Sequence, residues 1–356
     1  GISREGHREG VLGGEGGDEE FTVLCLDALE TRRPNSGVKI SDNTSDAVWD
    51  AAFDCLRRGS GNPAFYNDRG YRTGAVDLAA VTGDDLPHIA YGGCTEFMVE
   101  GRSNVGSIDA GINLLRVLEG SILSTMEEID SFAAFLETFK ADIRRQIEII
   151  VREVNLNQEC KAIYRPQMIR TLFVKDCLDT AIEYNNGGAR YNGGVINVAG
   201  IANAANALYA IRAVMNGHVP ITRRQLLDAL AHDYEGYAAV QRQLLDLTKF
   251  GNNDERVDSL ATEIVQCTFT EITQHRGWRA NGFFLPSTIM FVTYIAQGED
   301  IDATPDGRNA GTPIADSCGP MQGTDLDGPT SMLASTALLP QIQGLGTTIL
   351  NLRVSQ

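Results

Sequence analysis

Cys94 and Glu96 are the side chains whose types and spacing are best suited to chemistry. They lie in a glycine-rich turn, residues 91–97, that follows a short apolar run. A thiol can act as a nucleophile or a radical centre, and it needs a base within hydrogen-bond reach. An i, i+2 pair at the end of a strand places both side chains on one face. We therefore treat this pair as the candidate catalytic centre.

The competing interpretation is a cysteine with no chemical role. Free cysteine often packs in protein interiors as a small hydrophobic residue, which would leave Glu96 in solvent. Spacing alone favours this second interpretation over catalysis. A decision between the two requires support from other parts of the chain.

The composition predicts an ordinary globular protein. The chain has 356 residues, 43% hydrophobic and 22% charged, with a net charge of −17. Such a charge argues against nucleic acid, because binding phosphate requires basic patches, and no cluster of Lys and Arg stands out in the sequence. No apolar run approaches the roughly 20 residues that span a bilayer. With no secretory signal visible, we expect a cytoplasmic protein without nucleic-acid or membrane partners.

Cysteine and histidine spacing indicates neither disulfides nor a metal centre. The seven cysteines are scattered and include no C-x-x-C pair, which is typical of reduced thiols. The five histidines show no metal-ligand spacing. We therefore expect no metal ligands in this chain.

Short strands and long helices alternate along the sequence, which predicts an α/β fold in one domain, residues 1–356. We expect loops over 1–20, 187–194 and 303–329. The expected strands are 38–40, 63–67, 89–91, 283–292 and 347–352. The expected helices are 45–59, 109–154 with a break within 121–127, 201–217, and two that begin with caps at Thr222 and Asn253.

Three further features could contribute to a site. Tyr66 and Asn67, near the end of an early strand, could face a cavity and contact a substrate. Asp306 and Arg308 are expected to pair and hold their long loop, since long structured loops tend to be functional. The glycines of 187–194 could approach a phosphate, but the loop lacks the P-loop Lys and the strict G-x-G-x-x-G order. Close passage of backbone against another element is the favoured explanation.

Four separated segments, together with the closing residues 346–351, resemble the glycyl radical enzyme family, which includes pyruvate formate-lyase and the glycerol, diol and hydroxyproline dehydratases. The order and rough spacing agree along nearly the whole chain. The segments are Gly92–Glu96, Ala189–Asn192 leading to Gly200–Asn203, Lys249–Asp254 followed by Val257 and Asp258, and Thr304–Ser335.

The resemblance implies a ten-stranded α/β barrel, here partial, with Cys94 on a loop inside it. In this family a stable glycine radical oxidises the cysteine to a thiyl radical, which takes a hydrogen atom from a small-molecule substrate. An activating enzyme that uses S-adenosylmethionine and an iron–sulfur cluster installs the glycine radical. The resemblance therefore implies an anaerobic enzyme and a homodimer, with no cofactor bound directly by this chain.

Glu96 resembles the base of the family's eliminases, which acts on a substrate hydroxyl. The formate-lyase branch uses two adjacent cysteines, whereas Cys94 is flanked by Gly93 and Thr95. Asp109 resembles a substrate-contacting Asp of the dehydratases, although it could equally be a helix N-cap.

The sequence therefore predicts a glycyl radical lyase of dehydratase type. The alternatives are another glycyl radical reaction (a decarboxylase, a C–C synthase or a formate acetyltransferase) and a non-catalytic barrel relative that binds a small molecule.

The family's radical glycine lies in an R-V-x-G-Y type motif near the C-terminus. In this chain Arg353, Val354 and Ser355 are followed by Gln356, where the glycine would be needed. The family's N-terminal portion also has no counterpart here. We expect residues 1–356 to be an internal section of a longer enzyme, or a degenerate relative, and to be inactive alone.

Overall fold

The structure is a computed structural model. It describes residues 9–13, 18–29, 35–59, 61–91, 95–106 and 108–352. Within them, helices and strands alternate, and the strands form three separate sheets. Two of these sheets are parallel, and the third is a two-stranded antiparallel hairpin.

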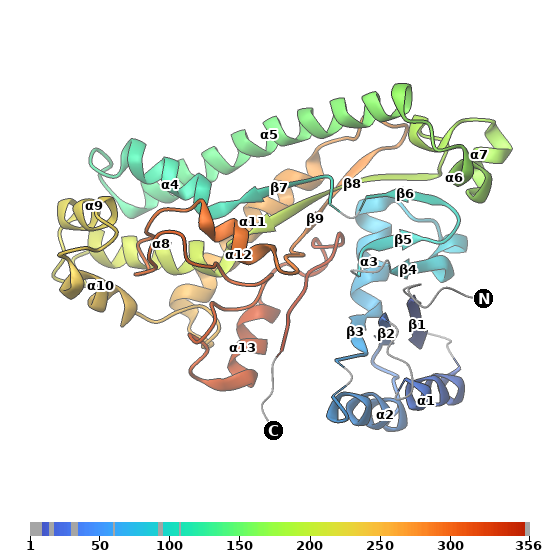
Figure 1. Cartoon of the computed structure of the whole chain (residues 1–356), viewed down its shortest axis with the longest axis horizontal. Coiled ribbons are helices and arrows are strands. Elements are labelled where there is room, and N and C mark those ends of the chain that lie inside the picture. Colours follow the sequence, from blue (N-terminus) through green and yellow to red (C-terminus); the bar gives the residue numbers. More distant parts are fainter. Residues whose placement is uncertain are drawn as a thin grey trace.

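The N-terminal part is a small parallel sheet covered by helices (Figure 1). Helix α2 is amphipathic: Val48, Ala51, Ala52 and Cys55 recur at helical spacing and are buried. These residues pack with Leu26 and Val38 in a core of their own. The elements are β1 (Glu9–Gly13), α1 (Glu19–Ala28), β2 (Asn35–Ile40), α2 (Asp46–Arg57), β3 (Ala64–Asn67) and α3 (Asp68–Ala79).

Strand β8 (Tyr191–Ala199) organises the main sheet, and all nine of its residues are buried. Strands β6 (Ser103–Val105) and β7 (Ala110–Asn113) pair with its two halves along one edge, and β9 (Phe283–Ser287) pairs along the other. Every pairing is parallel. Burial of both faces is typical of parallel sheets in α/β proteins.

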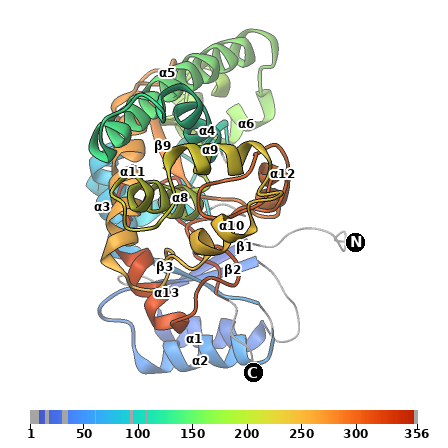
Figure 2. The ribbon, with the colours of Figure 1, turned by 90° about the vertical axis from the view of Figure 1, so that its left-hand side faces the viewer.

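Four helices pack with the main sheet and contribute most of the largest core. Helix α4 packs on α5, and α8 packs on α11. Figures 1 and 2 show α5 running along one side of the molecule. The four are α4 (Leu114–Thr125), α5 (Phe132–Tyr164), α8 (Ile201–Met215) and α11 (Glu255–Gln274).

Shorter elements complete the described chain. The hairpin consists of β4 (Ile89–Tyr91) and β5 (Phe97–Val99), and 3₁₀ helices η1 and η2 cover Gly83–His88 and Tyr184–Asn186. The short helices are α6 (Met168–Phe173), α7 (Lys175–Thr180), α9 (Arg223–Ala231), α10 (Ala238–Leu245), α12 (Thr293–Glu299) and α13 (Gly328–Ala337).

Most predicted elements are present, but the glycine-rich segment 187–194 was predicted wrongly as a loop before a helix. Its second half begins β8. The glycines are required because two aromatic rings pack against the strand. A Cβ on Gly193 would lie 2.6 Å from the Phe283 ring, and one on Gly194 would lie 2.6 Å from the Phe284 ring.

Several other boundaries also differ from the prediction, for example at the strand expected over 283–292, where β9 ends at Ser287. Residues 9–13 form a strand rather than a loop, and 110–113 form β7 rather than the start of a helix. The cap of α11 is Asp254, whose side chain accepts from the amide of Arg256, rather than Asn253. Of the predicted strand 347–352, Thr347 alone forms a bridge, to Ser287. Short β segments carry too few residues for a period to appear.

Among the described residues, no helix combines the length and apolar character needed to cross a membrane. In the same part of the chain, no three side chains of His, Cys, Asp or Glu gather as metal ligands. The assignment of 1–356 to a single domain stays a prediction.

Candidate active site

The β4–β5 hairpin carries the predicted catalytic pair. Its antiparallel register joins Ile89 to Val99 and Tyr91 to Phe97, so residues 92–96 connect the two strands. Cys94 lies outside the described residues. Glu96 is described, and it is 4% exposed. The expectation for an inert cysteine, that Glu96 points into solvent, is therefore wrong.

The hairpin connection is attached to the end of β9. The Thr347 hydroxyl donates a hydrogen bond to the carbonyl oxygen of Thr95, and Thr347 is itself bridged to Ser287. Thr95 has a φ of +77°, in the left-handed region that β-branched residues rarely adopt. Such a conformation persists where surrounding contacts impose it. The residue before Glu96 is thus held by a contact distant in sequence.

Three tyrosines pack beside the hairpin. The rings of Tyr66 and Tyr91 stack at 4.1 Å, and Tyr71 meets Tyr91 edge-on at 4.6 Å. Burial raises the pKa of Tyr71 to about 12; a hydrogen bond with Thr347 opposes this rise, and the charge of Glu96 adds to it. Burial likewise raises the pKa of Tyr91. The phenols of Tyr71 and Tyr91 are therefore neutral near pH 7, and the ammonium of Lys39 lies over the Tyr91 ring at 5.5 Å.

Two buried hydroxyls flank the connection. Among the described residues, neither the Tyr91 hydroxyl nor the Thr95 hydroxyl has a hydrogen-bond partner. Buried polar groups are normally satisfied, so both hydroxyls are free to bond a group that the described residues do not supply.

The other predicted substrate contacts take different positions. Tyr66 is 7% exposed, within the tyrosine cluster. Asn67 is exposed, and its side chain accepts from the amide of Gly70 at 2.9 Å, capping α3. Asp109 does not cap α4, because that cap is Asn113. Instead an Asp109 carboxylate oxygen accepts from the amide of Val195 at 2.9 Å, which fixes it to the middle of β8.

The long loop is held differently from the prediction. Asp306 and Arg308 do not form an ion pair; the Thr304 hydroxyl donates to Asp306 at 2.5 Å. Arg308 donates to the carbonyl oxygens of Gly298 at 2.8 Å, Asp302 at 3.0 Å and Thr312 at 3.1 Å. Burial lowers the pKa of Arg308. A guanidinium has five donors, which suits it to gathering backbone carbonyls.

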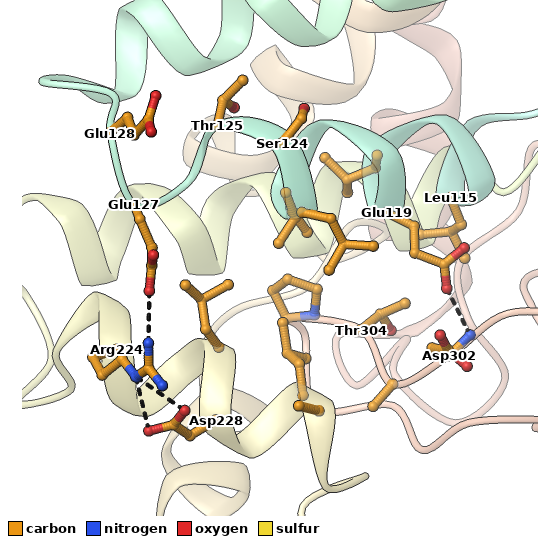
Figure 3. A pocket seen from close by; sticks show the side chains of 18 residues that line it. Leu115, Glu119, Ser124, Thr125, Glu127, Glu128, Arg224, Asp228, Asp302 and Thr304 are labelled. Atoms are coloured by element: carbon orange, nitrogen blue, oxygen red, sulfur yellow. Dashed lines mark hydrogen bonds and ion pairs between the residues drawn. The ribbon is translucent and has the colours of Figure 1, made fainter.

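A cavity of about 360 Å³ lies away from these residues, between α4, α9 and residues 302–305 (Figure 3). Nine of its eighteen lining residues are aliphatic or proline, and the other nine are polar or charged. At its rim Arg224 pairs with Glu127 at 2.9 Å, and Glu119 accepts from the amide of Asp302 at 2.9 Å. None of the predicted site residues lines it, so its size does not make it the candidate active site.

A family profile described as "PFL-like: Pyruvate formate lyase-like" matches residues 13–298. The chain belongs to the pyruvate formate lyase-like family. The recognition of glycyl radical enzymes from sequence segments is therefore confirmed. The structure also superposes on the glycerol-bound form of the B12-independent glycerol dehydratase from Clostridium butyricum with a TM-score of 0.90 and 26% identity, over 96% of this chain and 46% of that one. The predicted fold class is confirmed by this superposition.

Two curated relatives are similar along most of the chain. Trans-4-hydroxy-L-proline dehydratase of Clostridioides difficile is 27% identical over 96% of this chain and 45% of its own length. Probable dehydratase YbiW of Escherichia coli (strain K12) is 28% identical over 92% of this chain and 44% of its own length. The chain thus spans less than half the length of the relatives that it matches.

The signals that sequence reasoning missed are contacts between distant segments. Tyr71 and Thr347 lie far apart in the chain, and Tyr71 belongs to none of the segments that carry the family resemblance. Thr347 does fall within the closing segment of the family resemblance. Its place in residues 346–351 was the one indication in the sequence that these residues support the hairpin.

Proposed function

We propose that this chain forms the part of a glycyl radical lyase, of dehydratase type, that carries the thiyl cysteine Cys94 and the base Glu96. The observation that carries the proposal is the buried carboxylate of Glu96 beside the β4–β5 connection, two residues after a cysteine. Support comes from the relatives, which are named dehydratases. The substrate is a small polar molecule with a hydroxyl beside a leaving group.

The surroundings of the hairpin fit radical chemistry. Phe97 is fully buried, and Tyr66 and Tyr91 are nearly so. Exclusion of water protects reactive intermediates from side reactions. A glycine radical, installed by an activating enzyme that uses S-adenosylmethionine and an iron–sulfur cluster, supplies the unpaired electron.

The residues of the chain then have separate roles. Cys94, as a thiyl radical, takes a hydrogen atom from the carbon that bears the substrate hydroxyl. Glu96 accepts the hydroxyl proton, which promotes loss of the neighbouring leaving group. For a hydroxide leaving group, the same proton completes water. Cys94 returns its hydrogen atom to the adjacent carbon, so the thiyl radical is restored. Proton transfer by a positioned carboxylate contributes roughly 10²- to 10⁴-fold in rate.

Thr347 and Tyr71 position the base in this account. The Thr347 hydroxyl fixes the carbonyl of Thr95, next to Glu96. Tyr71 is a neutral donor on the same side, since burial raises its pKa to about 12. The contacts of Tyr66, Asn67 and Asp109 with substrate stay predictions.

The substitution Cys94→Ser tests the proposal in the activated enzyme that contains this chain. We expect the glycine radical to form, as seen by electron paramagnetic resonance, while turnover disappears. The substrates to test include trans-4-hydroxy-L-proline and glycerol, which are named for relatives. Wild-type turnover by the C94S variant would exclude the thiyl role, because a serine oxygen does not replace a sulfur radical.

A further inference from the structure

A second cavity, of about 210 Å³, lies at the C-terminal end of α5, and most of the charged residues in its lining are cations. Four of its eleven lining residues are basic, namely Lys161, Arg165, Arg170 and Arg279. Asp109 is the one acidic residue in the lining. The chain as a whole carries a net charge of −17. The lining of the cavity is therefore net positive, whereas the whole protein is strongly negative.

The cations come from separate elements. Lys161 is in the last turn of α5, Arg165 is the residue that ends it, Arg170 is in α6 and Arg279 precedes β9. This is why the sequence shows no Lys/Arg cluster. The 3₁₀ helix η2 closes the gap between them: the Asn185 side chain donates to the carbonyl of Arg165 at 2.8 Å.

Arg279 is the central feature of the cavity. It is 7% exposed, and its Nε donates to the carbonyl oxygen of Asn185 at 3.2 Å. Within the described chain this is the one hydrogen bond of its guanidinium, and no carboxylate lies within ion-pair distance. Burial lowers the pKa of Arg279, and the more distant charge of Asp109 opposes that change. Burying a charge without a partner is costly, so the guanidinium requires an acceptor.

The nearby carboxylates are engaged with backbone amides. Asp109 accepts from Val195 at 2.9 Å. Glu183 accepts from the amides of Gln167 at 2.5 Å and Asn186 at 3.0 Å. Over the described residues, neither Lys161 nor Arg165 is in an ion pair. The cavity is thus left with an excess of positive charge.

Compensation of the helix dipole is the simpler explanation for part of this arrangement. Cations at the C-terminus of a helix are stabilised by its partial negative charge. That explanation covers Lys161 and Arg165, which end α5. It does not cover Arg279, which belongs to another segment and is buried.

We propose that this cavity binds a small oxyanion, a phosphate, sulfonate or carboxylate group, with Arg279 as the principal ligand. Guanidinium pairs with such groups are charge-assisted and often bidentate. The proposal does not rest on the proposed radical function, because anion binding itself needs neither Cys94 nor activation, although Asp109, a predicted substrate contact, lines the same cavity.

Calorimetric titration of the purified protein with inorganic phosphate at low ionic strength tests the proposal. We expect saturable binding, weakened by roughly ten-fold or more in Arg279→Gln and less in Lys161→Gln. Arg224→Gln is the matched control, because Arg224 is exposed and pairs with Glu127 and Asp228 elsewhere on the surface. It should bind phosphate as the wild type does.

Two results would overturn the site: no saturable binding by the wild-type protein, or unchanged affinity in a folded R279Q variant. If R279Q does not fold, as judged by circular dichroism, phosphate binding is measured instead in the double variant Lys161→Gln/Arg165→Gln. Unchanged phosphate affinity in that variant refutes the proposal. Phosphate that raises KM in the activated enzyme would identify the occupant as the substrate's own anionic group. Binding without any effect on KM would identify a separate, free oxyanion.

Discussion

Tyr71 connects the proposed base to the residue that fixes its loop. Its hydroxyl hydrogen-bonds with Thr347, which holds the carbonyl of Thr95, and its pKa responds to the charge of Glu96. A neutral phenol at this place stabilises its surroundings without competing for the proton that Glu96 is proposed to take. The arrangement makes Tyr71 a positioning residue rather than a catalytic one.

The raised pKa of Tyr71 predicts alkaline destabilisation. The folded protein holds this proton up to about pH 12, whereas an unfolded tyrosine releases it near pH 10. Between these values the unfolded state binds fewer protons, so the free energy of unfolding falls as pH rises. Tyr71→Phe should reduce that fall, although it loses a hydrogen bond worth about 1 kcal/mol at neutral pH.

Chemical denaturation between pH 8 and 11.5 measures this effect. Tyr164→Phe is the control, because Tyr164 is 76% exposed. The buried thiol of Cys318, whose pKa burial raises to about 12, contributes a slope of the same sign in every variant. A Y71F protein with the same pH slope as the wild type would show that the phenol is not shielded in solution.

At the scale of elements, β8 is the strand around which the main sheet and the hairpin pack. It pairs with three strands, and its glycines allow rings from β9 to lie directly on the backbone. The hairpin reaches the same region, because Phe97 and Tyr191 share a core with Phe283 and Leu285. Packing of β8 against β9 therefore supports the candidate site.

Gly193→Ala should destabilise the protein. A Cβ at this position would lie 2.6 Å from the Phe283 ring, so the ring or the strand must move. Overpacking of this kind costs about 1–3 kcal/mol. The control is Gly111→Ala in β7, where the nearest atom would lie at an ordinary 3.5 Å. Thermal unfolding compares the two, and a G193A protein as stable as G111A would refute the packing argument.

The fold was predictable where periods are long and caps are specific. The helix over 201–215 and the capping box at Thr222 follow from side-chain spacing. Strand β8 was missed because Gly193 and Gly194 signal turns locally, and the aromatic rings that require them come from a segment about ninety residues later. The candidate pair Cys94 and Glu96 was found from motif and spacing. The hydrogen bond from Thr347 to the carbonyl of Thr95 is a tertiary contact that no local pattern encodes.

At the scale of the whole molecule, the match to each relative covers nearly all of this chain but less than half of the relative. The superposition on the glycerol dehydratase covers 96% of this chain and 46% of that chain, with a TM-score of 0.90. Within the described residues, strand pairing does not join its two parallel sheets and the hairpin into one closed barrel. The enclosure that radical chemistry needs is therefore a property to be tested in the activated enzyme.

The central claim is that Glu96 is the base for elimination, and Glu96→Gln in the activated enzyme tests it most directly. The amide keeps the size of the buried side chain but does not accept a proton. We expect product formation to fall by roughly 10²- to 10⁴-fold. A substrate-derived radical should still form, seen by electron paramagnetic resonance as a signal that changes with deuterated substrate. Glu100→Gln, exposed on the same hairpin, should be active. Unchanged turnover in E96Q would contradict the account.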